Sequence, residues 1–399
     1  MEKVKQKPLL VLFLVVFIDL LGFGLIIPIL PIYASELGAP SWVIGWVAAS
    51  YSLMQFAFGP VWGNLSDRWG RKPILMGSMA LMACSYVLFA YSFTLMILFV
   101  SRICAGIAAA NISAAQAYIS DSTPPSERAR HFGIIGAAFG LGFIGGPPVG
   151  GFLKAEFGVM AVGWAAAGLS IFNLLMTYFL LPESLDKKFR TKRKMENPLN
   201  RLWTSIRRPG IGRLMAFTLI FISAFSMMHV TASLFWAEEF GLSEKRIGLL
   251  FMYIGLMAAL IQGFMIGHFN RWFGEKQLLI YGSALMLLGL LALPFPPSDW
   301  FYPWELFCLA VISVGNAFLT PTISSLLSRM ASEDEQGAVM GAYQSYASLG
   351  RVIGPVVGGW LYGFSYQWPY VASAVLMAVC IWTALRLAWR EGFHQFQTN

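Results

Sequence analysis

The chain has 399 residues, of which 57% are hydrophobic and only 12% are charged, with a net charge of +8. Soluble globular domains carry about 25% charged residues, so this composition excludes an ordinary water-soluble protein. The positive charge lies in short segments between apolar stretches, as the topology signals of membrane proteins do, so we expect the lipid bilayer as a partner and no nucleic acid.

Twelve apolar segments follow one another along the chain, and a membrane-spanning helix needs about 20 apolar residues. The predicted spans are 9–31, 42–62, 74–91, 94–119, 132–153, 162–181, 211–237, 245–267, 277–294, 303–328, 337–363 and 368–390. We therefore predict an all-α membrane protein with twelve transmembrane helices, whose even number places both termini on one side.

The distribution of basic residues predicts which side faces the cytoplasm. Of the 28 Lys and Arg residues, 23 lie on the side of the termini and 3 on the other side, namely Lys154, Lys245 and Arg246. The positive-inside rule then places both termini in the cytoplasm, with the bacterial plasma (inner) membrane as the expected location. The basic loop 182–210 would be a solvated topology signal, and contact with anionic lipid is the alternative.

A pattern of glycine and proline recurs in register in the two halves of the chain. It occupies positions 133, 142, 146, 147, 150 and 151 and returns 208 residues later, and residues 63–72 resemble residues 267–276. Secondary transporters are commonly built from such internal repeats. We predict two pseudo-symmetric six-helix bundles, 1–181 and 211–399, joined by a cytoplasmic linker, 182–210.

Two charged residues lie deep within predicted spans of the first half. At 1.5 Å per residue, Asp19 is about 16 Å and Arg102 about 12 Å from the outer end of its span. A charge in the bilayer core is costly, so each is a functional candidate. Burial favours the protonated carboxyl and a nearby Arg favours the carboxylate, so the pair is a candidate proton switch. A fixed ion pair that joins two helices is the alternative.

The second half offers candidates for substrate binding. Arg351 lies near the middle of span 11, and we expect it to line a watery cavity or bind an anionic group, with backbone pairing as the alternative. His229 in span 7 is either a second proton site or a hydrogen-bonded packing residue. Further polar candidates at mid-depth are Asn111, Gln116, Asn173, Gln262, Asn316, Tyr343 and Gln344.

The recurring glycines and prolines have two interpretations. Glycine allows helices to pack closely, and a proline within a helix breaks its hydrogen-bond ladder and permits bending. We expect close packing, and we add bending during transport as a hypothesis. The residues concerned are Gly142, Gly146, Pro147, Gly150, Gly350, Gly354, Pro355 and Gly358.

These motifs resemble those of the major facilitator superfamily, and within it the drug:proton antiporters of the tetracycline-efflux type. Residues 63–72 resemble the loop motif between spans 2 and 3, and residues 19–28 the span 1 motif of proton-coupled members. Residues 102–106 resemble the span 4 motif, 133–151 the span 5 motif of antiporters, and 181–184 a segment that follows span 6 in tetracycline exporters.

The resemblance also implies a cytoplasmic gate. Asp67 would face the N-terminus of span 11 near Gln336 and Gly337, where the helix dipole favours an anion, and Arg71 would pair with Asp121. A plain topology signal is the alternative. The residues of this gate are Gly63, Asp67, Arg68, Gly70, Arg71 and Asp121.

The sequence departs from tetracycline pumps in two spans and lacks the usual catalytic motifs. Span 3 has Ser85 where those pumps carry an acid, and span 9 contains no acid, which weakens the case for tetracycline itself as the substrate. No Gly-x4-Gly-Lys-Ser/Thr motif, metal-ligand spacing or nucleophile triad occurs in the sequence. We therefore expect neither an enzyme nor a bound cofactor.

The motifs together predict a monomeric transporter that exports small amphiphilic compounds in exchange for protons by alternating access. The many aromatic and Met residues suit an apolar, adaptable cavity. Alternatives are a proton-linked or facilitative transporter of a metabolite, a lipid translocator, and a membrane receptor or scaffold that transports nothing.

Overall fold

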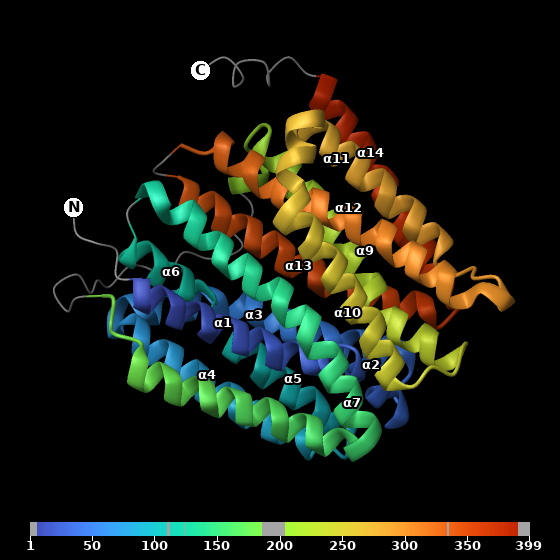
Figure 1. Cartoon of the computed structure of the whole chain (residues 1–399), viewed down its shortest axis with the longest axis horizontal. Helices are drawn as coiled ribbons and strands as arrows, with labels where there is room; N and C mark the ends of the chain where they lie inside the picture. Colours follow the sequence, from blue (N-terminus) through green and yellow to red (C-terminus); the bar gives the residue numbers. More distant parts are fainter. Residues whose placement is uncertain (1–5, 110–111, 124, 186–203, 333–334, 390–399) are drawn as a thin grey trace. The chain divides into compact units, whose positions relative to one another are not determined.

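The computed structural model describes residues 6–109, 112–123, 125–185, 204–332 and 335–389. Every regular element within these ranges is a helix (Figure 1), as the apolar pattern predicted. The helices are α1 Gln6–Ile26, α2 Ile29–Glu36, α3 Ser41–Trp69, α4 Arg71–Ala90, α5 Leu95–Ala109, α6 Ile112–Ser122, α7 Pro125–Leu180, α9 Ile211–Glu238, α10 Glu244–Leu260, η2 Ile261–Met265, α11 Ile266–Ala292, η3 Ser298–Trp300, α12 Phe301–Met330, α13 Gln336–Tyr362 and α14 Trp368–Trp389.

Two continuous helical runs each span two predicted segments: α7, and the run Glu244–Ala292 that α10, η2 and α11 form. α7 changes direction at Gly158 (φ 78°), and α11 does so at Gly274 (φ 76°), a backbone conformation that glycine adopts without a steric penalty. By length and composition, seven helical segments within the described residues are long and apolar enough to cross a membrane, and residues 140–180 and 244–292 exceed a single crossing. With the changes of direction at Gly158 and Gly274, the order of the helices accommodates the twelve predicted spans.

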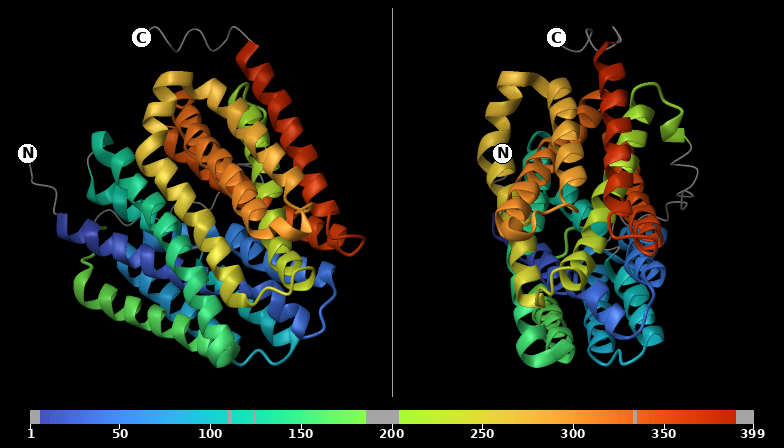
Figure 2. Two further views of the ribbon diagram at one scale, coloured as in Figure 1. Left: turned by 45° about the vertical axis from the view of Figure 1, so that its right-hand side comes forward. Right: turned by 90° about the vertical axis from the view of Figure 1, so that its right-hand side faces the viewer.

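The chain divides into two compact units. The first contains residues 1–197 and 233–252, and the second contains residues 198–232 and 253–399. Within the first unit, α1 packs along α7, and α4 packs on α5 and α7. Within the second unit, α11 packs on both α12 and α14 (Figure 2). The predicted linker boundaries stay a prediction, because residues 186–203 lie outside the described part of the chain.

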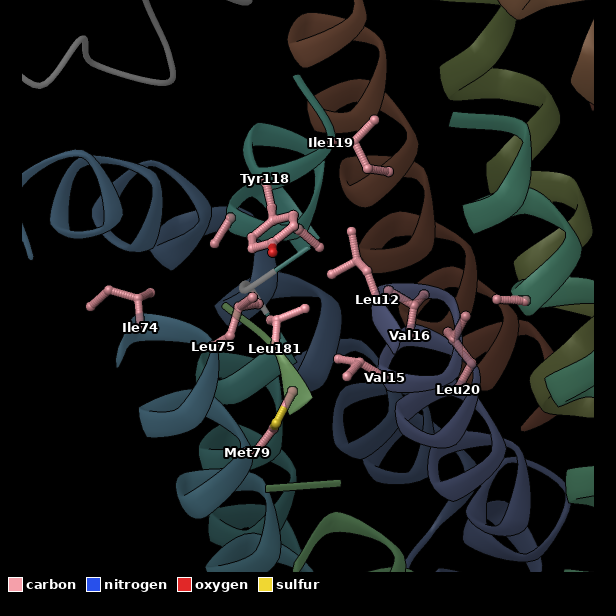
Figure 3. Packing of buried hydrophobic residues seen from close by; sticks show 13 residues of the cluster. Leu12, Val15, Val16, Leu20, Ile74, Leu75, Met79, Tyr118, Ile119 and Leu181 are labelled. Carbon is pink, nitrogen blue, oxygen red and sulfur yellow. The ribbon is translucent and has the colours of Figure 1, made fainter. Parts of the chain in front are cut away.

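One apolar cluster in the first unit fixes α1 against α4 and α6 (Figure 3). The α1 members follow helical spacing, so they share one face of that helix. Asp19 lies on α1 one turn after two of them and directly before a third. The labelled members are Leu12, Val15, Val16, Leu20, Ile74, Leu75, Met79, Tyr118, Ile119 and Leu181.

The recurring glycines lie where helices approach closely. A Cβ atom added at Gly142 would lie 2.9 Å from the backbone of Leu20, and one added at Gly146 would lie 2.6 Å from that of Gly24, both on α1. In the second unit, a Cβ atom at Gly350 would lie 2.9 Å from Cβ of Ile222 on α9. Each glycine series thus packs its helix on the first helix of its own half, which supports the packing interpretation. Bending stays a prediction.

Lys154, predicted on the outer side, connects three helices of the first unit. Its ammonium group bonds the carboxylate of Glu36, at the end of α2, and that of Glu244, at the start of α10, at 2.7 Å. The lysine is only 8% exposed, so the two carboxylates replace water around its charge. This contact attaches the first turn of α10 to α7.

Candidate functional site

The carboxylate of Asp19 on α1 bonds a buried amide on α7. Nδ2 of Asn173, which has no exposed surface, donates hydrogen bonds to Oδ1 of Asp19 and to the carbonyl oxygen of Val15, both at 2.8 Å. Val15 and Asp19 are four residues apart and therefore on one face of α1, so a single amide group reaches both. The close packing of α1 on α7 makes this contact possible.

Tyr86 on α4 is the common neighbour of the two charges predicted to act together. The charges of Asp19 and Arg102, and the hydroxyl of Tyr51, all act on the Tyr86 hydroxyl, which is buried. The guanidinium carbon of Arg102 lies 4.8 Å from the ring centroid of Phe89, and its Nε is 3.4 Å from Oγ of Ser101. The charges of Asp19 and Arg102 are thus both near enough to influence one buried tyrosine.

Three buried polar atoms around this acid have no hydrogen-bond partner among the described residues. They are Nη2 of Arg102, Oη of Tyr86 and Oδ1 of Asn173. A buried polar group without any partner costs about 1–3 kcal/mol, so such groups are expected to bind ordered water, a ligand or a partner that changes with the state of the protein. Together they supply a fixed donor, a hydroxyl and a fixed acceptor, the groups needed to solvate a proton or a small polar ligand.

The loop between α3 and α4 is organised by Arg71, which is 6% exposed. Its Nη1 is 2.6 Å from Oδ1 of Asp67, and its Nε is 2.9 Å from Oδ2 of Asp121 on α6. The contact expected between Arg71 and Asp121 is therefore present. Gly70 joins the two helices at φ 106°, which glycine permits. The role of these residues as a gate stays a prediction.

Other members of the predicted loop motif have simpler roles in the structure. The carbonyl oxygen of Gly63 accepts a hydrogen bond from the hydroxyl of Ser66, and Arg68 is exposed. Glu183, which follows α7, accepts hydrogen bonds from the backbone N–H groups of Arg71, at 2.8 Å, and of Ser184. The sequence singled out this segment by resemblance alone, without a role for the acid.

The N-terminus of α13, the expected partner of Asp67, already carries a carboxylate. Glu335 accepts hydrogen bonds from Nη2 of Arg208 at 2.8 Å and from the hydroxyl of Ser332 at 3.0 Å. The bond from Arg208, with help from that of Ser332, lowers the pKa of the Glu335 carboxyl. The approach of Asp67 to this helix end stays a prediction.

Two of the predicted cavity residues on α13 lie together. Arg351 is half-buried, its Nη2 donates to Oγ of Ser348 at 3.1 Å, and its charge acts on the buried hydroxyl of Tyr343. Gln344, which follows Tyr343 in the sequence, is exposed. The hydroxyl of Ser348 thus contributes to holding Arg351, and sequence analysis missed it because a serine in a span is unremarkable.

The remaining cavity candidates are scattered among the helices. Gln262 lies in the π-helical turn η2, a feature often found at functional sites. Oδ1 of Asn316 accepts a hydrogen bond from Thr320 at 3.3 Å, and the ring of His229 lies 4.6 Å from that of Phe225. Asn111 and the side chain of Gln116 lie outside the described residues.

Sequence analysis did not single out one fully buried acid. Glu305 of α12 has no exposed surface, and its charge acts on Tyr370 of α14 and on Cys308. The sequence does contain a signal for Glu305, namely an acidic residue within the first turns of an apolar span. Within the described residues, no group of three or more His, Cys, Asp or Glu side chains could hold a metal ion.

Comparison with known proteins gives a consistent result over the whole chain. A model of the Major Facilitator Superfamily matches residues 12–354 and 216–395. The class C tetracycline resistance protein of Escherichia coli is 34% identical over 398 residues, covering 96% of this chain and 98% of that protein. Multidrug resistance protein 1 of Bacillus subtilis (strain 168) is 29% identical over 397 residues, covering 99% of each.

Solved structures of transporters share the fold. The human organic anion transporter MFSD10 (TETRAN) superposes with a TM-score of 0.73 at 25% identity, covering 95% of this chain and 99% of that one. The nucleoside transporter NupG gives a TM-score of 0.78 at 14% identity, covering 96% of this chain and 100% of that one. The second likeness concerns the fold alone.

Proposed function

The chain belongs to the Major Facilitator Superfamily, and from this premise we propose that it exports small amphiphilic compounds in exchange for protons by alternating access. It is an integral membrane transporter with the all-α, twelve-helix fold of that family. Relatives named for tetracycline, multidrug and quinolone resistance support efflux of drug-like molecules. The proposal includes a bacterial inner membrane, cytoplasmic termini and a monomer.

The observation that supports proton coupling is the half-buried carboxylate of Asp19 within the apolar helix α1. It is bonded by Asn173 and acts, together with Arg102, on the hydroxyl of Tyr86. Low polarity around the acid favours its protonated form, and the positive charge of Arg102 favours the carboxylate. A movement of Arg102, or its engagement by substrate, would let Asp19 take up a proton, and its return would release that proton.

A gate at the loop between α3 and α4 completes the proposal. The ion pairs from Arg71 to Asp67 and Asp121 hold the loop on α6. We propose that Asp67 also binds the positive end of the α13 dipole in the state that is closed to the cytoplasm. Opening would break that contact and leave the pairs of Arg71 in place.

Arg351 indicates which class of substrate the protein would carry. A half-buried cation beside Tyr343 and Ser348 favours compounds that carry an anionic or polar group. MFSD10, a similar protein, transports organic anions. The alternatives are a proton-linked or facilitative transporter of a metabolite and a lipid translocator, for which an anionic headgroup would suit Arg351.

The first prediction concerns substrate-induced proton release from the purified protein in detergent. Cationic, neutral and anionic amphiphiles are added to wild type and Asp19→Asn, with Glu156→Gln as the control because Glu156 is an exposed acid on α7. We expect release from wild type and the control, and none from Asp19→Asn, although it still binds the compound. Unchanged proton release or uphill transport by Asp19→Asn contradicts the proposed coupling site.

A further inference from the structure

We propose that Asn173 is the positioning residue that sets how tightly Asp19 holds its proton. Its amide would donate to the carboxylate in the charged state and accept from the carboxylic acid in the neutral state. This inference rests on the proposed role of Asp19 in proton coupling. It assigns to a neutral side chain of α7 the control of the pH range in which the transporter works.

The observed contact between Asn173 and Asp19 is the one that suits the charged state. Nδ2 of Asn173 donates to Oδ1 of Asp19 and to the carbonyl oxygen of Val15, both at 2.8 Å. A backbone carbonyl can only accept a hydrogen bond, so the amide atom that bonds Val15 is the nitrogen, and the amide oxygen is the other end of the group. A hydrogen bond donated to a carboxylate stabilises the charged form relative to the acid.

The neutral state uses the other end of the same amide. Oδ1 of Asn173 is buried and has no hydrogen-bond partner among the described residues. When Asp19 takes up a proton from water, its carboxyl group gains an O–H donor, and an amide offers such an acid one acceptor beside its donor. A rotation of the amide would turn this oxygen toward Asp19, where it can accept a hydrogen bond from the protonated acid.

Other groups near Asp19 also influence its protonation, and they do so independently of Asn173. Tyr86 of α4 lies with its ring against Gly22, and its hydroxyl is influenced by Arg102 of α5 and Tyr51 of α3. The charge of Arg102 favours the carboxylate whichever residue stands at position 173. Substitutions of Asn173 therefore change the contribution of the amide and leave this cation in place.

The test is infrared difference spectroscopy of the purified transporter in lipid, recorded as a function of pH. The carbonyl band of the protonated acid is assigned to Asp19 by its loss in Asp19→Asn. Asn173→Leu removes both ends of the amide with little change in shape. Thr177→Val is the matched control, since Thr177 is equally buried one turn later on α7 and bonds Sδ of Met79.

We expect the midpoint of the Asp19 band to move to higher pH by about 1 unit in Asn173→Leu, because the bond lost from the carboxylate is stronger than the bond lost from the neutral acid. Thr177→Val should titrate as wild type does. Asn173→Ser, a smaller change that also removes the amide, should shift the midpoint in the same direction if the Leu variant does not yield folded protein.

Two outcomes would overturn the inference, and they are distinguishable. If Asp19 titrates but its midpoint is the same in wild type and in the Asn173 variants, Asn173 has no positioning role and the proposed function stands. If no band in the wild-type protein depends on Asp19, the proton site itself is misassigned, and the inference fails together with that part of the proposed function.

Discussion

Arg351 lies in the middle part of α13, half-buried, with Ser348 and Tyr343 as neighbours. It lies on a different helix from Asp19, which is on α1. Replacement of Arg351 should therefore alter which compounds are carried and leave proton coupling largely intact. In the proposed mechanism, proton coupling and substrate selection thus depend on separate side chains, Asp19 and Arg351.

We predict that Arg351→Ala changes the ratio of transport rates for anionic and cationic amphiphiles by about tenfold, as loss of one charge-assisted hydrogen bond would. Arg351→Lys, which keeps the charge, should keep most of the preference. The measurement is transport by reconstituted protein under an imposed proton gradient. Equal losses for all compounds would instead indicate a role in the common transport step.

At the scale of residues, the sequence identified the charged groups but not their neighbours. Asp19, Arg102 and Arg351 stand out because a charge within an apolar span is costly. Asn173 was recognised only as polar at mid-depth, and its bond to Asp19 depends on how α7 packs on α1. Tyr86 was missed, because a tyrosine in a span is common and only packing places it beside both charges.

At the scale of helices, the close contact between α1 and α7 requires glycine. A Cβ atom at position 146 would lie 2.6 Å from the backbone of Gly24, closer than packed atoms allow, whereas one at Gly168, also on α7, would meet nothing within 4 Å. Because backbone cannot move aside as a flexible side chain can, the clash at position 146 must separate the two helices. Position 168 therefore provides a control on the same helix.

We predict that Gly146→Ala destabilises the protein by about 1–3 kcal/mol through overpacking. Gly168→Ala should be neutral or stabilising by about 0.5–1 kcal/mol, because alanine suits a helix better than glycine. The two variants are compared by thermal unfolding in detergent. Equal melting temperatures would show that α1 and α7 tolerate a wider spacing than the structure has.

The sequence predicted the spans well but not how the helices continue between them. The gap predicted between spans 5 and 6 contains Gly158, and the gap between spans 8 and 9 contains Gly274. Hydrophobic pattern marks where apolar stretches end, but a positive φ at one glycine depends on the helices that it joins. The π-helical turn η2 around Gln262 likewise had no signal in the pattern.

For the molecule as a whole, the proposed cycle depends on contacts that form in one state and break in another. Arg71 holds Asp67 and Asp121 at the loop after α3. We expect Asp67 to contribute to closure toward the cytoplasm through the N-terminus of α13. Its removal should therefore shift the balance between inward-facing and outward-facing states without unfolding the loop, since Asp121 still pairs with Arg71.

We predict that Asp67→Asn raises the inward-facing fraction several-fold. The measurement is the distribution of distances between spin labels on the cytoplasmic ends of helices in the two halves. Glu156→Gln, with an exposed acid outside the loop, should match wild type. An unchanged distribution in Asp67→Asn would leave the loop as a topology signal only.

The sequence by itself determined the membrane environment, the twelve spans, the duplication and the family, because these follow from composition and from motifs that are continuous along the chain. Only the tertiary structure decided which groups surround Asp19. Asn173 of α7 bonds Asp19, and Tyr86 of α4 lies against Gly22 of α1, so both neighbours depend on how these helices pack. Helical periodicity fixes the face of a side chain, but its partner depends on the rotation of the neighbouring helix, which no local pattern specifies.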